Sequence, residues 1–512
     1  MSTLERCSGI LLHPTSLPGG FGVGELGEMA YRWIEFLEKA KQTVWQILPL
    51  GPTGYGNSPY STSSVFAGNP ILIDMSRLAF EGFLDHRDLE NAPAFSKDHV
   101  DFEAVINWKM PLLQRSYQKF LVSANETSRK AFEQFCNKYD DMWLDEFATY
   151  MAIKNHFGGS SWHTWDEELR LRKSKALKSI KKELADEILA TKFIQHQFFK
   201  QWAGIKKYAN EKGIQIIGDI PIYVNFDSAE VWASQDKFLL DDAGNPTEVS
   251  GVPPDYFSPT GQLWGNPLYD WKRMKKGGYT WWIDRIKMTM ETVDILRIDH
   301  FRGFESYWAV PFGEKTAENG VWRKGPANDF FDVLLEALGD VPIVVEDLGF
   351  ITPEVRKLRE DYNFPGMKIL QFAFGGDTEE AFLPHNYDQN CIVYTGSHDN
   401  DTTRGWFEKS APHEQQYCLA YLGGIKNDIS WDMVRLASSS TALMSIFPLQ
   451  DLLSLGSDAR MNMPGKPDGN WSWRLLPDQL QPHHAQRMAE ITHIFGRDPK
   501  SRKNKTSNES VS

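Results

Sequence analysis

Eight short apolar runs, rich in β-branched residues, are spaced along the chain, and each is about as long as a buried strand. Several are followed by a segment with apolar residues at helical spacing, such as 31–37 and 329–338, and Thr352 before Pro353 predicts a helix start. This alternation is typical of βα units around a parallel sheet. We therefore predict an α/β protein whose eight strands close into a (β/α)8 TIM barrel, without a C-terminal β-domain. The expected strands are residues 9–12, 44–50, 214–224, 295–298, 343–346, 367–372, 391–395 and 443–449.

Two long segments interrupt the alternation, both within one expected barrel domain of residues 1–500. Residues 80–200, between the second and third strands, carry apolar residues at helical spacing, and we expect a helical insertion because a structureless loop of that length is improbable. Residues 225–282, between the third and fourth strands, are expected to form a loop-rich insertion. The polar tail 501–512 is expected to be disordered.

The loop-rich segment contains two stretches, 251–257 and 261–267, in which Gly and Pro are expected to prevent regular structure. Aromatic residues punctuate both stretches. An ordinary solvent-facing connection is one interpretation; a functional loop over the barrel rim is the other. We favour the functional loop, because exposed connections seldom hold so many aromatic residues.

The charge and the aromatic content narrow the class of ligand. A net charge of −13 disfavours nucleic acid as a partner, because binding of a phosphate backbone draws on clustered Lys and Arg. The 18 Trp and 17 Tyr residues suit sugar rings, whose apolar faces stack on aromatic side chains, although most of these residues can equally fill a large core.

Neither a metal nor another cofactor is expected. The four cysteines are far apart and show no zinc spacing, which favours a reducing, cytosol-like compartment. The chain start lacks the pattern of a secretion signal, and no run reaches the roughly 18 apolar residues of a membrane span. We expect a cytoplasmic protein, or a plastid stromal one if a transit peptide was removed.

Three of the apolar runs lead into an acid: Asp299, Glu346 and Asp399. In a parallel barrel the three carboxylates gather at the C-terminal rim, where such enzymes carry their chemistry. Retaining cleavage of a glycosidic bond needs two carboxyl groups about 5–5.5 Å apart, one ionised and one protonated. The sequence therefore points to glycoside chemistry.

Each acid suits a different role. Arg297, two residues before Asp299 and on the same face of the strand, can hold that carboxylate ionised for nucleophilic attack. Glu346 ends an apolar run and can keep a raised pKa as the general acid/base. Asp399 can oppose the positive charge of the transition state, and His398 can donate to sugar hydroxyls. The alternative for any one acid is a structural role, as a helix cap or an arginine partner.

Two further residues lie at expected strand ends. Tyr60 follows the second strand in a loop with glycines and a proline, and its ring is available for stacking on a sugar. Asp219 ends the third strand, where it can bond either Arg297 or a sugar, and a purely structural role is about as well supported.

Long motifs in the same order make this sequence resemble the amylomaltase (4-α-glucanotransferase, disproportionating enzyme) family from about residue 8 to 497. They are residues 54–70, 218–233, 251–267, 296–303, 345–349 and 396–403. Ser397 stands where the family commonly has Thr. The resemblance implies an α-amylase-type barrel with Asp299 as nucleophile, Glu346 as acid/base and Asp399 as transition-state stabiliser. It also implies that the following residues line the subsites: Ser58, Tyr60, Asp219, Tyr256, Phe257, Trp264, Arg297, His398, Asn462, Pro464 and Gly465.

The function expected from this resemblance is retaining transfer of an α-1,4-glucan segment to the 4-hydroxyl of another glucan or of glucose. Its partners are then α-1,4-glucans and malto-oligosaccharides. An α-1,4-glucan hydrolase of the α-amylase type is the nearest alternative, since it uses the same acids. A non-catalytic glucan-binding module is a more distant one.

Overall fold

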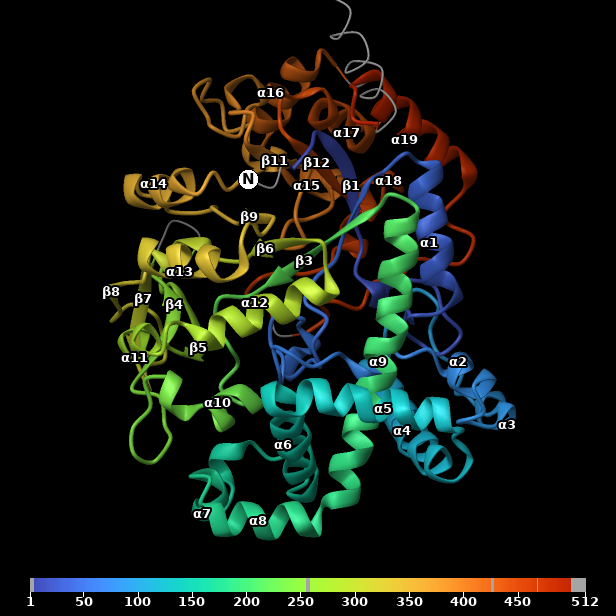
Figure 1. Ribbon diagram of the computed structural model, residues 1–512. Coiled ribbons are helices and arrows are strands. Elements are labelled where there is room, and N and C mark those ends of the chain that lie inside the picture. Colours follow the sequence, from blue (N-terminus) through green and yellow to red (C-terminus); the bar gives the residue numbers. More distant parts are fainter. Residues whose placement is uncertain (1–3, 255–257, 425–427, 467, 499–512) are drawn as a thin grey trace, which may run out of the picture.

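A parallel eight-stranded barrel forms the centre of the computed structural model, which describes residues 4–254, 258–424, 428–466 and 468–498 (Figure 1). The prediction of a (β/α)8 barrel is confirmed, and all eight expected strands are present. In spatial order they are β10 (Gly366–Ile369), β11 (Cys391–Tyr394), β12 (Met444–Pro448), β1 (Cys7–Leu11), β2 (Val44–Gln46), β3 (Gln215–Ile220), β6 (Ile295–Ile298) and β9 (Ile343–Val345).

The barrel is nearly closed between β10 and β9, the first and last strands of this spatial order. β9 and β10 meet where the Val345 N–H donates to the Pro365 carbonyl at 3.0 Å. Apolar side chains from neighbouring strands pack inside, which is the reason for the β-branched runs in the sequence. The buried members of this inner cluster include Leu11, Val44, Ile217, Ile295, Val344, Ile369, Ile392 and Ile446.

Three strands end three or more residues before their apolar runs do. β2 ends at Gln46 and β10 at Ile369, and β3 ends at Ile220 because Pro221 has no N–H to donate to the sheet. The runs continue past these points because their residues stay buried outside the ladder: Leu48 is 1% and Ile222 is 2% exposed.

Helices surround the barrel, as Figure 1 shows. The helical patterns at 31–37 and 329–338 are confirmed by α1 (Glu28–Lys39) and α13 (Asn328–Leu338). The expected helix start at Thr352 is also confirmed, because its side chain caps α14 (Pro353–Asp361). The other barrel helices are α9 (Ala185–Glu211), α12 (Thr280–Thr292), α15 (Thr403–Lys409), α16 (Pro412–Leu422), α17 (Ile429–Ser439), α18 (Leu449–Leu452) and α19 (Pro482–Ile494).

Among the described residues, seven further α-helices lie between β2 and the start of α9, and two between β3 and α12. In Figure 1, α4 to α8 gather at the lower end of the molecule. None of the helices in the described part of the chain is long and apolar enough to cross a membrane. The nine helices are α2 (Met75–Phe80), α3 (His86–Glu90), α4 (Phe102–Ser123), α5 (Glu126–Tyr139), α6 (Asp145–His156), α7 (Glu167–Arg170), α8 (Ser174–Glu183), α10 (Ala229–Ala233) and α11 (Trp271–Lys276).

A second, antiparallel sheet lies beside the barrel. Its order is β5 (Gln262–Pro267), β4 (Glu248–Val252), β7 (Ser306–Pro311) and β8 (Val321–Lys324). The expectation that 261–267 and the start of 251–257 lack regular structure was therefore wrong. Glycine is required rather than disruptive here, because a Cβ on Gly251 would lie 2.6 Å from the Gln262 carbonyl oxygen of the neighbouring strand.

Candidate active site

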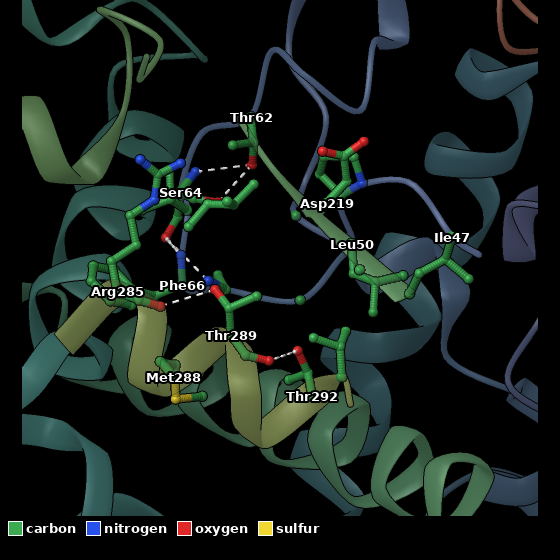
Figure 2. A pocket seen from close by; sticks show the side chains of 18 of the residues that line it. Ile47, Leu50, Thr62, Ser64, Phe66, Asp219, Arg285, Met288, Thr289 and Thr292 are labelled. Atoms are coloured by element: carbon green, nitrogen blue, oxygen red, sulfur yellow. Dashed lines mark hydrogen bonds between the residues drawn. The ribbon is translucent and has the colours of Figure 1, made fainter. Parts of the chain in front are cut away.

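A cleft of about 410 Å³ opens at the C-terminal ends of the barrel strands. This volume is in the range of small-molecule sites. A second cavity behind it, between the barrel and α12, holds only about 70 Å³ and is too small for a sugar ring (Figure 2). The cleft is lined by Ser58, Tyr60, Tyr223, Trp264, Asp299, His300, His398, Asp399, Asn462, Pro464, Gly465, Lys466, Asn470 and Trp471, among others.

Arg297 lies behind Asp299 and connects two carboxylates. The register of β3 and β6 pairs Asp219 with Arg297, so their side chains project side by side. One guanidinium nitrogen of Arg297 lies 2.5 Å from Asp219 Oδ2 and 3.1 Å from Asp299 Oδ1. Arg297 and Asp219 are buried, whereas 27% of the Asp299 side chain is exposed to the cleft. Arg297 thus fixes the orientation of Asp299, the one of these two carboxylates that a ligand can reach.

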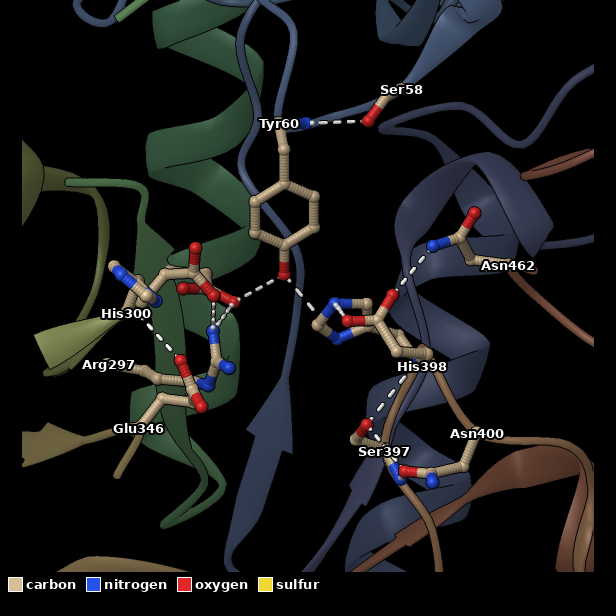
Figure 3. A network of polar contacts seen from close by, with 12 residues as sticks. Ser58, Tyr60, Arg297, His300, Glu346, Ser397, His398, Asn400 and Asn462 are labelled. Atoms are coloured by element: carbon tan, nitrogen blue, oxygen red, sulfur yellow. Dashed lines mark hydrogen bonds and ion pairs between the residues drawn. The ribbon is translucent and has the colours of Figure 1, made fainter. Parts of the chain in front are cut away.

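Tyr60 joins the two sides of the cleft. Its hydroxyl donates to Asp219 Oδ2 at 2.7 Å and lies 3.4 Å from His398 Nδ1, as Figure 3 shows. Its ring stacks on the His398 imidazole, with ring centres 5.0 Å apart. The loop before it is fixed by the Tyr60 N–H, which donates to Ser58 Oγ at 3.2 Å. Much of the Tyr60 ring surface is therefore already used for packing.

Glu346 is held against the residue that follows Asp299. Its Oε2 accepts the His300 N–H at 2.7 Å, and its Oε1 accepts the Leu348 N–H at 3.0 Å. His300 has a left-handed backbone with φ of +50°, uncommon for a residue with a side chain, and this conformation is part of the turn that presents its N–H to Glu346. Glu346 is not among the residues that line the cleft. The turn brings the two acids next to each other.

Both members of this pair hold their protons more tightly than free carboxylic acids. Burial raises the pKa of Asp299 to about 6, against the opposing charge of Arg297. Burial and the charge of Asp299 raise the pKa of Glu346 to about 7. Arg297 therefore lowers the pKa of Asp299, the direction that its position in the sequence suggested, but burial has the larger effect. Asp299 still has the lower pKa of the two, so it ionises before Glu346, as the expected roles of the two acids require.

Asp399 gives up its proton more readily than a free carboxylic acid, in contrast to Asp299 and Glu346. Burial works against its ionisation, but the charge of His398 and the hydrogen bonds from His398 and Asn462 hold its pKa well below the usual range. Asn462 Nδ2 donates to Asp399 Oδ1 at 2.6 Å, and His398 Nε2 lies 3.3 Å from Asp399 Oδ2. Burial also opposes the charged form of His398 and so acts to lower its pKa. The charge of the Asp399 carboxylate and its hydrogen bond with His398 outweigh burial, and the net pKa of His398 is raised. When His398 is protonated, the two side chains form an ion pair at the cleft wall.

The remaining expected site residues lie around the cleft. Trp264 is 39% exposed, and its ring meets the His300 imidazole edge-on with centres 4.8 Å apart. Pro464 and Gly465 form a turn beside Asn462, and Gly465 has a φ of +80° that favours glycine. Tyr256 and Phe257 lie outside the described residues.

Two aromatic lining residues were not expected from the sequence. Trp471 packs against Tyr60 and His398, with ring centres 6.1 and 5.9 Å away. Its backbone φ of +63° is rare for a bulky residue, and the sequence carries no sign of it. Tyr223 was hidden within an apolar run predicted as strand 214–224, although Pro221 was a signal that the strand ends earlier.

No group of three or more His, Cys, Asp or Glu side chains is arranged to hold a metal ion within 4–254, 258–424, 428–466 and 468–498. Residues for the direct contacts of a sugar are present instead. The cleft offers aromatic faces, carboxylates and side-chain amides, which are the partners of apolar ring faces and hydroxyl groups.

Comparison with known proteins gives strong matches over almost the whole chain. A family model described as 4-alpha-glucanotransferase matches residues 12–479. The chain is 52% identical to the 4-alpha-glucanotransferase of Synechocystis sp., over 96% of this chain and 98% of that protein, and 48% identical to the one of Thermus thermophilus, over 96% and 99%. Among solved structures, it is similar to amylomaltase from Streptococcus agalactiae in complex with acarbose, with 40% identity and a TM-score of 0.94 over 96% of this chain and all of that one.

Proposed function

This chain belongs to the 4-alpha-glucanotransferase family, and we propose that it transfers a segment of an α-1,4-glucan to the 4-hydroxyl of another glucan or of glucose. The reaction proceeds by a retaining double displacement. One observation carries this proposal: the Glu346 carboxylate accepts the N–H of His300, the residue next to Asp299, so that Glu346 lies beside the acid that faces the cleft.

In the first displacement, Asp299 attacks the anomeric carbon of the donor while Glu346 gives its proton to the leaving glycosidic oxygen. The C1–O bond to the leaving glucan breaks and a glycosyl ester forms on Asp299. Arg297 keeps the attacking carboxylate oriented at 3.1 Å. The raised pKa of Glu346 supplies an acid that is still protonated near neutrality.

In the second displacement, the 4-hydroxyl of an incoming sugar attacks C1 and Glu346, now ionised, takes up its proton. The ester breaks, Asp299 is regenerated, and the number of glucosidic linkages is unchanged. Asp399, ionised over the whole working range, stabilises the positive charge that develops on the sugar ring in both steps. His398 and Asn462 position that carboxylate.

Sugar binding is assigned to the residues around these acids. We propose that Trp264 stacks on a sugar ring, and that Tyr60, Asp219, Arg297 and His398 serve the subsite next to the nucleophile. Ser58, Tyr256, Phe257, Asn462, Pro464 and Gly465 complete the subsites. In this proposal residues 1–500 are one catalytic barrel, with a helical insertion at 80–200 and a loop-rich insertion at 225–282 that shapes the substrate site and favours a sugar over water as acceptor.

We further propose that the protein acts in the cytoplasm or a plastid stroma, on α-1,4-glucans and malto-oligosaccharides. The widely separated cysteines support a reducing compartment, and the net charge of −13 supports neutral ligands over nucleic acid.

Incubation with pure maltotriose tests transfer against the hydrolase alternative. Transfer gives glucose and longer oligomers while the number of reducing ends stays nearly constant, because each cleavage is matched by a new linkage. The oligomer products are measured by chromatography, and the reducing ends are measured in the same samples by a reducing-sugar assay. A steady rise of reducing ends in step with substrate loss would identify a hydrolase. Binding without any product would identify a glucan-binding module.

A further inference from the structure

Two exposed aromatic rings lie next to the barrel rim but outside the cleft. Trp322 on β8 is 41% exposed, and Phe350, in the loop that follows Glu346, is 72% exposed. Neither is a lining residue of the cleft. β8 is the outer strand of the antiparallel sheet, at the margin of the molecule in Figure 1.

Arg302 fixes both rings in place. Its guanidinium carbon lies 4.0 Å from the centre of the Trp322 ring and 5.9 Å from that of Phe350. One terminal nitrogen donates to the Phe350 carbonyl and the other to Ser306 Oγ. Trp308 packs edge-on against Trp322, with centres 5.2 Å apart. We call Trp322, Phe350 and Arg302 the aromatic platform; its rings are held in position before any ligand arrives.

The aromatic platform continues the wall of the cleft. Arg302 lies two residues after His300, which lines the cleft, and two residues span at most about 7 Å. Phe350 lies four residues after Glu346. The two rim segments that carry Asp299 and Glu346 therefore also carry Arg302 and Phe350, and Arg302 holds Trp322 of β8 beside them. A chain leaving the cleft on this side meets exposed rings.

The charges around the aromatic platform favour a neutral ligand. Lys324 is paired with Glu305, and Arg323 with Glu248. These cations are thus already neutralised, and Arg302 is occupied by its own contacts. Exposed aromatic faces with neutralised charges suit a sugar chain rather than an anionic polymer.

We propose that the aromatic platform binds the part of a long α-1,4-glucan that extends beyond the cleft. This inference rests on the proposed function, since it assigns a further contact to the same substrate. Maltotriose is too short to use the platform fully, whereas amylose reaches it, so the platform selects for long chains.

The double variant Trp322→Ala/Phe350→Ala tests this with amylose and maltotriose. The ratio of the KM for amylose to the KM for maltotriose should rise about fivefold or more, because two stacking faces are lost. Phe80→Ala is the matched control: Phe80 is 78% exposed on α2, with the Arg77 guanidinium 5.6 Å from its ring, and its removal should leave the ratio unchanged. Trp322→Phe/Phe350→Tyr, which keeps both rings, should restore the ratio.

Binding is measured separately in an Asp299→Asn background, from the retardation of the protein in native gels that contain amylose. The platform variant should be retarded less than its parent. Unchanged retardation and an unchanged KM ratio would overturn the proposal that the aromatic platform binds glucan. If the wild-type protein fails to disproportionate maltotriose, the proposed function fails, while the gel still reports on the platform. If the double variant does not fold, Phe350→Ala alone is used, and it must give a smaller change in the same direction.

Discussion

Two carboxylic acids that lie next to each other titrate as a pair, and the order in which they lose their protons decides whether they can divide attack and proton transfer between them. With pKa values of about 6 for Asp299 and about 7 for Glu346, the attacking form has Asp299 ionised and Glu346 protonated. That form is most populated between the two values.

The pH profile of kcat/KM for maltotriose should therefore be bell-shaped, with its maximum between about pH 6 and 7. Below this range Asp299 takes up a proton and cannot attack; above it Glu346 loses the proton that the leaving oxygen needs. Initial rates over a pH series give the profile. In Glu346→Gln, assayed with maltotriosyl fluoride, the alkaline limb should disappear because fluoride leaves without a proton. An alkaline limb that persists there would contradict the assignment of Glu346.

The sequence predicted which acids stand at strand ends, because an apolar run that ends in a carboxylate is visible in one dimension. It did not predict the raised pKa of Asp299, which results from burial by residues far away in the chain. It also gave no sign of the left-handed backbone at His300, which is defined only once the turn after β6 is folded.

Among the structural elements, α10 holds the loop that carries Ser58 and Tyr60. Ser64 Oγ, at the end of that loop, donates to Glu230 Oε1 of α10 at 2.6 Å, and the Ala229 N–H donates to the Ser63 carbonyl at 2.9 Å. Burial raises the pKa of Glu230 to about 7, with the Ser64 hydrogen bond acting against the shift. Glu230 is thus protonated in the folded protein under mildly acidic conditions.

Because its pKa is higher in the folded than in the unfolded chain, Glu230 makes the protein less stable as the pH rises from about 5 towards 7, and the loss is complete above that. Glu230→Gln removes this dependence. The free energy of unfolding of the variant minus that of wild type should be larger at pH 8 than at pH 5 by roughly 2–3 kcal/mol, which means that the variant gains stability relative to wild type as the pH rises. Urea unfolding of both proteins at the two pH values measures this. If the free energies of unfolding of the two proteins differ equally at pH 5 and pH 8, Glu230 does not titrate as described.

The elements themselves were predictable to different degrees. The barrel strands were found because buried β-branched runs are distinctive, and α14 because Thr352 and Pro353 are strong start signals. β4 and β5 were missed because their glycines resemble loop residues, whereas Gly251 is needed for close contact between strands. The pairing of β4 with β7 joins segments from both sides of β6, which no local pattern reveals.

At the scale of the whole molecule, two sheets meet at the site. The barrel contributes Asp299, Glu346 and Asp399 from the segments that follow β6, β9 and β11. The antiparallel sheet contributes Trp264 on β5 to the cleft, and Trp322 on β8 lies outside it. In the proposed function, the barrel supplies the chemistry that glycosidases and transglycosylases share. The second sheet adds aromatic surface beside it, and a site with more sugar contacts favours a sugar over water as acceptor.

The central claim is that the donor glucan is held as an ester on Asp299 before transfer. It is tested most directly by mass spectrometry of Glu346→Gln after brief exposure to maltotriosyl fluoride without an acceptor. Fluoride departs without an acid, and release of the ester is slow without a base. We predict one maltotriosyl adduct per chain, mapped by peptide sequencing to Asp299 and absent from Asp299→Asn/Glu346→Gln. Release of fluoride with no adduct, or with an adduct on another residue, would contradict the account.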